Sequence, residues 1–334
     1  MGNEQQLTLM DAVLSMSRRK KVSRAVKTLD EIGKMVDWDA LAVIVEGLDR
    51  TRGGKGGRPP ISFKVKLKML FLQYTFNLSD EELEDQLIDR LSFQQFVGLG
   101  YDEEIPDFTT FWHFKEALVR NALMDPVFEC ILSQIESRGL ILKRGTIVDA
   151  TIVQSGNQPL SRAKRERLER EPSRQIDTDA RSTAKGGKKH FGYKGHIGID
   201  AGSKIIRKRT FTPANVNDIC ELHNLMSGDE KGVWGDKAYP KDQDKRAARA
   251  AGIYYGILDK GRAGRKLSGK QEKQNKQKTR VRAAVEHPFA FMKGKLKAQV
   301  LSARNKMRNS LRFDMWCIVY NVLRASFLIK RQTA

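Results

Sequence analysis

The sequence predicts an α/β domain with a mixed sheet and flanking helices, preceded by an all-helical region. Before about residue 138, apolar residues recur at helical spacing. After about residue 140, β-branched runs alternate with short helical segments. The composition of the 334 residues, 40% hydrophobic and 30% charged, is typical of globular proteins. This length allows two domains, or two domains and a small third.

The charge of the chain indicates a polyanionic partner. Lysine and arginine number 61 against 40 aspartate and glutamate, a formal net charge of +21. Acidic residues dominate 80–107, whereas basic residues dominate 260–308, where Glu272 and Glu286 are the only acids. Nucleic acid is the leading candidate for the partner of this basic stretch. A basic segment without a specific partner is the alternative.

The cysteines predict a reducing compartment. Cys130, Cys220 and Cys317 lie far apart, without the paired spacing of a disulfide framework or a zinc knuckle. Apolar runs are too short to cross a bilayer. We therefore expect a cytoplasmic protein.

The first 60 residues predict a helical arm followed by a linker. Apolar periodicity from Trp38 to Leu48 indicates a helix. Residues 52–60, Arg-Gly-Gly-Lys-Gly-Gly-Arg-Pro-Pro, are typical of a flexible connector whose charge suits a phosphate backbone.

Residues 61–138 predict successive helices. Ser79 and Glu82 have the spacing of a capping box, in which each side chain binds the other residue's backbone N–H. Asp107, after Pro106, begins a further helix. Short helices in this order are consistent with a helix-turn-helix-like DNA-binding domain, and a plain helical bundle is the alternative.

Residues 139–334 predict the mixed sheet. We expect a strand over 145–153, a hairpin over 196–211 that turns at 201–203, a helix over 218–226, a strand over 232–234, a helix over 241–251 and a basic helical end. The helical end has an apolar face from Phe313 to Leu323. The charged segment 161–189, within a basic insertion of about 155–193, reads as a loop or an exposed helix.

Three acids stand out by their context. Asp149 lies inside an apolar strand, Asp236 follows a short strand, and Glu286 is isolated in the basic stretch. A buried carboxylate needs a neutralising cation. Carboxylates that converge from two strands and a helix suit phosphodiester chemistry with two Mg²⁺ ions, for which Mn²⁺ can substitute. Structural acids in a nucleic-acid-binding domain are the alternative.

Four motifs, in their order along the chain, resemble those of a known protein family. They are Val148-Asp149-Ala150-Thr151, the segment from His190 to Asp200, the segment from Thr212 to Asp218, and Gly235-Asp236-Lys237-Ala238-Tyr239. With them, the chain resembles DDE transposases of the bacterial insertion-sequence group five, within the group four superfamily. The resemblance spans about residues 61–328.

The third acid of that family lies in a Tyr-Arg-Glu-Lys signature. Arg282, Glu286 and Lys293 keep its last two spacings, whereas Thr279 occupies the Tyr position. The three matching residues would share a helix face. Pro288 should either kink that helix or mark its start.

The resemblance implies a function. It implies an RNase H-like catalytic domain in which Asp149, Asp236 and Glu286 form the catalytic, metal-binding triad. It also implies binding of double-stranded DNA, with residues 61–123 on the terminal inverted repeats, hydrolysis at the element's ends and transfer of the 3′-hydroxyl strands to target DNA. Such an enzyme is expected to act as a homodimer or higher oligomer, associated with the bacterial nucleoid. We expect DNA contacts from a basic set: Arg282, Lys293, Lys237, Lys297 and Arg304.

Two alternatives remain at this stage. One is a metal-dependent nuclease that cuts without joining, and the other is a DNA-binding repressor or inactive relative whose acids are structural. Among further residues, His287 is a weak candidate ligand, and Tyr239 and Trp234 are candidates to stack on a displaced base. Core packing is the favoured role for Trp234. Lys185, Lys188 and Lys189 form a basic patch suited to nonspecific DNA contact.

Overall fold

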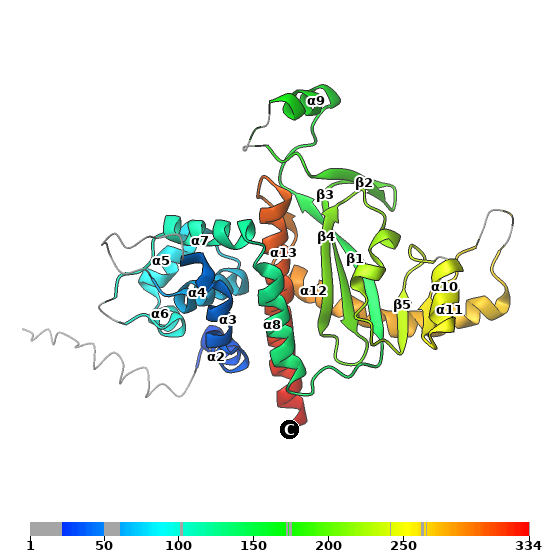
Figure 1. Ribbon diagram of the computed structural model, residues 1–334, viewed down its shortest axis with the longest axis horizontal. Coiled ribbons are helices and arrows are strands. Elements are labelled where there is room, and N and C mark those ends of the chain that lie inside the picture. The colour runs from blue at the N-terminus through cyan, green and yellow to red at the C-terminus, as the bar shows by residue number, and fades with distance from the viewer. Residues whose placement is uncertain are drawn as a thin grey trace, which may run out of the picture.

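The computed structural model describes residues 22–49, 61–100, 103–171, 173, 176–240, 242–261, 264 and 266–333. A cluster of helices and a mixed sheet lie on opposite sides of the long C-terminal helix α13 (Lys306–Gln332) (Figure 1). The predicted linker over 52–60 lies outside the described residues.

The N-terminal cluster consists of short helices, most of which have a polar N-cap. They are α2 (Arg24–Met35), α3 (Trp38–Val45), α4 (Phe63–Phe76), α5 (Asp80–Asp89), α6 (Leu91–Val97), α7 (Phe108–Arg120) and α8 (Met124–Glu136), with a 3-10 turn, η1 (Glu46–Asp49), after α3. The predicted capping box is present: the Ser79 N–H donates to Glu82, and the Glu82 N–H donates to the Ser79 hydroxyl. Asp107 caps α7, as predicted.

Within the described residues, seven strands form one mixed sheet. They are β1 (Thr146–Ser155), β2 (Arg181–Lys185), β3 (Lys188–Asp200), β4 (Ile206–Pro213), β5 (Gly232–Gly235), β6 (Tyr254–Ile257) and β7 (Val300–Leu301). The order is β2-β3-β1-β5-β6, with β4 paired to β3 and β7 to β1. Strands β1 to β4 pair antiparallel, whereas β1, β5 and β6 run parallel. This is the RNase H-like α/β fold that the sequence predicts.

Helix α13 packs against both halves of the molecule. It contacts α2, α4, α7 and α8 on one side and β4 and α12 (Glu286–Gly294) on the other. Gly195 of β3 permits this close packing, because a Cβ there would lie 2.2 Å from the Phe313 ring. One apolar core therefore runs from Leu29 to Ala325.

Asn321 joins α13 to the sheet by two backbone contacts. Its amide nitrogen donates to the Ile206 carbonyl, and its amide oxygen accepts from the Ile206 N–H, each at 2.8 Å. Asn321 is fully buried, so without it both backbone groups of Ile206 would lose these partners in the core.

Several elements differ from the sequence prediction. Strand β3 begins at Lys188 instead of His196 and forms a hairpin with β2, inside the segment expected to be a loop or an exposed helix. That segment also contains the expected exposed helix, α9 (Arg162–Arg170). The predicted helix over 218–226 is two 3-10 turns, η2 (Asp218–Glu221) and η3 (His223–Leu225). Strands β6 and β7 were not predicted: β6 has Gly256 inside its four residues, and β7 has only two residues.

The remaining predicted elements are confirmed. Strand β5 and α10 (Asp242–Ala250) match their predictions, and the apolar face of α13 from Phe313 to Leu323 is buried. Within the described residues, no helix is both long and apolar enough to span a membrane.

We predict that Asn321→Ala lowers the free energy of unfolding by about 2–4 kcal/mol, because it leaves two buried backbone groups unpaired. Urea unfolding followed by circular dichroism measures the change. The exposed Asn224→Ala is the control and should change stability by less than about 0.5 kcal/mol. Equal effects of the two variants would contradict this role of Asn321.

Candidate catalytic site

Asp149 lies in the middle of the central strand β1. It pairs with Ile197 of β3, and it is 8% exposed. Its Oδ1 accepts a hydrogen bond from the Ala150 N–H at 2.9 Å. The three residues before it, Thr146 to Val148, are β-branched and buried, so this carboxylate is introduced into the core of the sheet.

Asp236 is brought level with Asp149 by the parallel pairing of β1 and β5. Thr146 pairs with Val233 and Ile147 with Trp234. Continuing this register by two residues places Asp236, the first residue after β5, beside Asp149 of β1, at a backbone spacing of about 5 Å. The Ala238 N–H donates to Asp236 Oδ1 at 2.7 Å and fixes this carboxylate where β5 ends.

Glu286 approaches from the helical layer. Helix α11 (Gly269–Arg282) ends at Arg282, a 3-10 turn η4 (Ala283–Val285) follows, and α12 begins at Glu286. Pro288 therefore lies in the first turn of α12 and marks its start, one of the two outcomes predicted for it. The Glu286 side chain is 65% exposed.

Arg282 connects two of the three acids. Its Nη2 donates to Asp149 Oδ2 at 2.9 Å and lies 3.8 Å from Glu286 Oε1. The Arg282 side chain is 21% exposed and that of Asp149 is 12% exposed. The guanidinium thus supplies the cation that the buried carboxylate requires.

The pKa of Asp149 shows how the three acids act on one another. Burial raises it above its ordinary value, and Arg282 and the Ala150 N–H oppose that rise. The negative charges of Asp236 and Glu286 raise the pKa further, so all three carboxylates lie within electrostatic reach. Such a cluster of like charges is stabilised by any added cation.

The donor chemistry of this site fits a divalent metal ion. Carboxylate oxygens are the ligands that Mg²⁺ and Mn²⁺ prefer, and a guanidinium already takes a cation's place at Asp149. Within the part of the chain that the structure describes, no three His, Cys, Asp or Glu side chains are gathered closely enough to hold an ion. Arg282 and the Ala150 N–H each occupy one oxygen of Asp149, so an ion at these acids would compete with Arg282 for Asp149 Oδ2.

The predicted DNA-binding residues fall into two groups. Arg282, Lys237 and Lys293 lie beside the acids, and Glu286 and Lys185 both act on the pKa of Lys293. Partial desolvation and Lys185 lower that pKa, whereas Glu286 raises it. Lys297 and Arg304 flank β7, which pairs with the far end of β1. The structure therefore does not bring these two to the acids.

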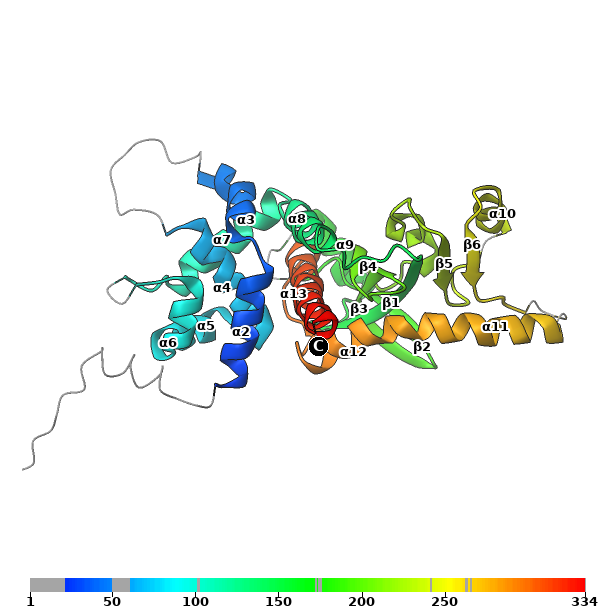
Figure 2. The same cartoon turned by 90° about the horizontal axis from the view of Figure 1, so that it is seen from below.

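Helix α11 presents basic residues that the site prediction did not single out. Lys270, Lys273, Lys276 and Arg280 are exposed along it. Lys278 is different: it is 7% exposed, and it donates to the Ile257 carbonyl at 2.9 Å and to Asp259 at 2.8 Å. In Figure 2, α11 runs beside the sheet and past its edge. The basic run over α11 was the sequence signal for such a surface. Only the structure distinguishes Lys278, which binds Ile257 and Asp259, from the exposed basic residues.

Other candidates have structural roles. Tyr239 is fully buried, so the predicted stacking on a displaced base is wrong for this residue. Burial raises its pKa, and the charges of Asp218, Asp149 and Asp236 add to that rise, which places its hydroxyl near the acids. Trp234 packs against Tyr254, with ring centroids 5.7 Å apart. The His287 Nδ1 lies 3.0 Å from the Tyr320 hydroxyl, so this ring faces α13.

Comparison with known proteins gives two family matches in chain order. Residues 16–117 match the model of a transposase domain of the class DUF772, and residues 141–322 match the transposase DDE domain. Among solved structures, the chain is similar to a piggyBac transposase synaptic complex with hairpin DNA. That similarity has 10% sequence identity and a TM-score of 0.45, over 92% of this chain and 75% of that chain.

We predict that Arg282→Ala destabilises the protein by about 2 kcal/mol or more, because it leaves a buried carboxylate unpaired. In an Asp149→Asn background, the same change should cost less than about 1 kcal/mol, since no charge remains to be paired. Urea unfolding in the presence of EDTA measures both values. Arg280→Ala, an exposed change two residues away, is the control. A cost for Arg282→Ala no larger than that of the control would contradict the ion pair.

Proposed function

The chain belongs to the transposase DDE family, and from this premise we propose that it cuts DNA at the ends of its own mobile element and joins the freed 3′ ends to target DNA. We place it in insertion-sequence group five on the motifs given above. The observation that carries the proposal is the convergence of Asp149, Asp236 and Glu286 around Arg282.

We propose that Asp149, Asp236 and Glu286 are the catalytic residues and hold the metal, Mg²⁺ or Mn²⁺, as two ions. When bound, such ions activate the attacking oxygen and stabilise the leaving 3′ oxygen of an in-line displacement. The chain's own part is to fix the ligands: the Ala238 N–H orients Asp236, the Ala150 N–H orients Asp149, and the β1–β5 register keeps the two acids level.

The basic residues beside the acids would position the DNA. In this proposal Arg282, once it releases Asp149, binds a phosphate next to Glu286. Lys237 and Lys293 act as further phosphate contacts, and the exposed side chains of α11 extend that surface beyond the sheet. Phosphate contacts of this kind fix the register of the duplex without reading its sequence.

The helical block would bind the terminal inverted repeats, which makes double-stranded DNA the partner. In the first turn of α5, Glu81 and Glu82 are exposed and would repel a duplex, whereas Asp80 is paired with Lys115. The side of the block toward α13, where Arg308 and Arg312 lie, is the surface whose charge suits the duplex. We further propose that two copies act together on two ends, in the bacterial cytoplasm on the nucleoid.

The direct test uses the purified protein, Mg²⁺ and a labelled duplex that carries the end of its own element. We expect nicking at the end, followed by joined products. Asp236→Asn should lower the rates of nicking and of joining by at least about a hundredfold. The change removes a proposed metal ligand and, with it, several kcal/mol of transition-state stabilisation. Glu272→Gln, an exposed acid on α11, is the control and should retain activity.

The outcomes separate the alternatives. Nicking without joined products would indicate a nuclease that does not transfer strands. Binding without cleavage in every variant would indicate a repressor or an inactive relative, with Arg282 permanently paired to Asp149. Cleavage undiminished by Asp236→Asn would show that the assignment of the triad is wrong.

A further inference from the structure

A cavity of about 330 Å³, separate from the candidate catalytic site, lies between the helical cluster and the start of α13. Its walls come from α4, α5 and α7, from the first turns of α13, and from the segment 302–304 that follows β7. This volume is within the range of pockets that bind small organic groups. None of the three acids of the candidate catalytic site lines it.

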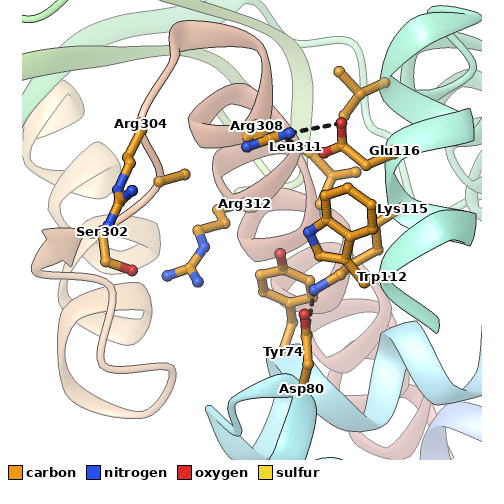
Figure 3. A pocket seen from close by; sticks show the side chains of 12 residues that line it. Tyr74, Asp80, Trp112, Lys115, Glu116, Ser302, Arg304, Arg308, Leu311 and Arg312 are labelled. Atoms are coloured by element: carbon orange, nitrogen blue, oxygen red, sulfur yellow. Dashed lines mark hydrogen bonds and ion pairs between the residues drawn. The ribbon is translucent and has the colours of Figure 1, made fainter. Parts of the chain in front are cut away.

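One wall of this cavity is cationic. Arg304 and Arg312 both line it, and neither has an ion pair among the residues that the structure describes. Figure 3 shows Arg312 extending into the space between Arg304 on one side and Trp112 and Tyr74 on the other. The two carboxylates that also line the cavity are paired with other residues, Asp80 with Lys115 and Glu116 with Arg308, so the guanidinium groups of Arg304 and Arg312 are suited to a phosphate.

The opposite wall is aromatic. Trp112 of α7 is 38% exposed, unusually high for this side chain at the edge of a cavity. The Arg308 guanidinium lies over its ring at 5.6 Å and is itself fixed by two bonds to Glu116, of 2.5 and 2.9 Å. A second opening shares Trp112 and Arg312 and adds Phe108, which is 41% exposed and one helical turn away.

An aromatic ring opposite free guanidinium groups recognises a nucleotide. The ring stacks on a base, which any of the four bases permits, and the guanidinium groups bind the phosphate. Both features are needed, since a fully paired duplex presents phosphates but no accessible base face. The cavity therefore fits a nucleotide whose base is unpaired.

We propose that this cavity binds one unpaired nucleotide of the DNA, with its base on Trp112 and its phosphate on Arg304 and Arg312. The inference rests on the proposed function, because the unpaired nucleotide belongs to the DNA on which the candidate catalytic site acts. Strand β1 connects the candidate catalytic site with this cavity. Asp149 lies six residues before Ser155, and Ser155 pairs with Leu301 beside the cavity. That length is roughly 20 Å along the strand, or about six base steps of DNA.

The test compares two duplexes of the same end sequence, one fully paired and one with a single unpaired 2-aminopurine. The unpaired base is placed in turn at about four to eight positions from the end. Anisotropy gives the affinity of the full chain in Ca²⁺, and 2-aminopurine fluorescence reports stacking. We expect preference for the unpaired duplex at one position, with quenching of the probe.

The variants assign that preference to the cavity. Trp112→Ala and Arg312→Ala should each lower affinity for the unpaired duplex about tenfold, while affinity for the paired duplex falls less than about twofold. Trp112→Phe, which keeps an aromatic ring, should retain most of the preference. Phe327→Ala is the matched control, because Phe327 is also exposed beneath an arginine, Arg324, but lies outside the cavity.

Other results would overturn the inference. Equal affinity for the two duplexes at every position, or a preference that survives Trp112→Ala, would show that the cavity binds no unpaired base. Quenching of tryptophan fluorescence by free deoxyadenosine monophosphate, with no preference between duplexes, would assign the cavity to a free nucleotide instead. Failure to bind either duplex would contradict the proposed function as well, and that outcome is distinct from binding without preference.

Discussion

The ion pair between Asp149 and Arg282 is the interaction on which the candidate site depends. A carboxylate in the centre of a buried strand is unfavourable unless a cation neutralises it. Arg282 provides that cation at the last residue of α11 and lies 3.8 Å from Glu286 as well. The same contact therefore pairs the buried acid and brings the helix-borne acid toward the sheet.

That contact in turn requires α11 to be fixed against the sheet. The helix is polar on all sides, so apolar packing contributes little to its position. Lys278 replaces such packing with hydrogen bonds to Ile257 and Asp259, at the end of β6 and just after it. Because β6 is parallel to β5, and β5 to β1, the position of Arg282 is tied to the strands that carry Asp236 and Asp149.

Much of the fold could be predicted from the sequence. The structure brings the three acids that the sequence singled out within electrostatic reach of one another, and their catalytic role stays a prediction. The β-branched run around Asp149 and the apolar face of α13 have clear periodicity, and the structure contains both. Strand β6 is interrupted by Gly256 and β7 has only two residues, so neither gives such a pattern, and the buried Lys278 resembles its exposed neighbours in a basic run. The Asp149–Arg282 pair joins residues 133 positions apart, so spacing alone could not reveal it. The cavity beside Trp112 depends likewise on packing of α7 against α13.

The central claim is that the three carboxylates accept a divalent cation in place of Arg282. Mn²⁺ titration of the full chain without DNA, followed by electron paramagnetic resonance, tests it independently of cleavage. Wild-type protein should bind Mn²⁺, and Asp149→Asn should weaken this binding at least about tenfold. Equal Mn²⁺ affinity in the two proteins would contradict the claim, because the ion would then be bound elsewhere.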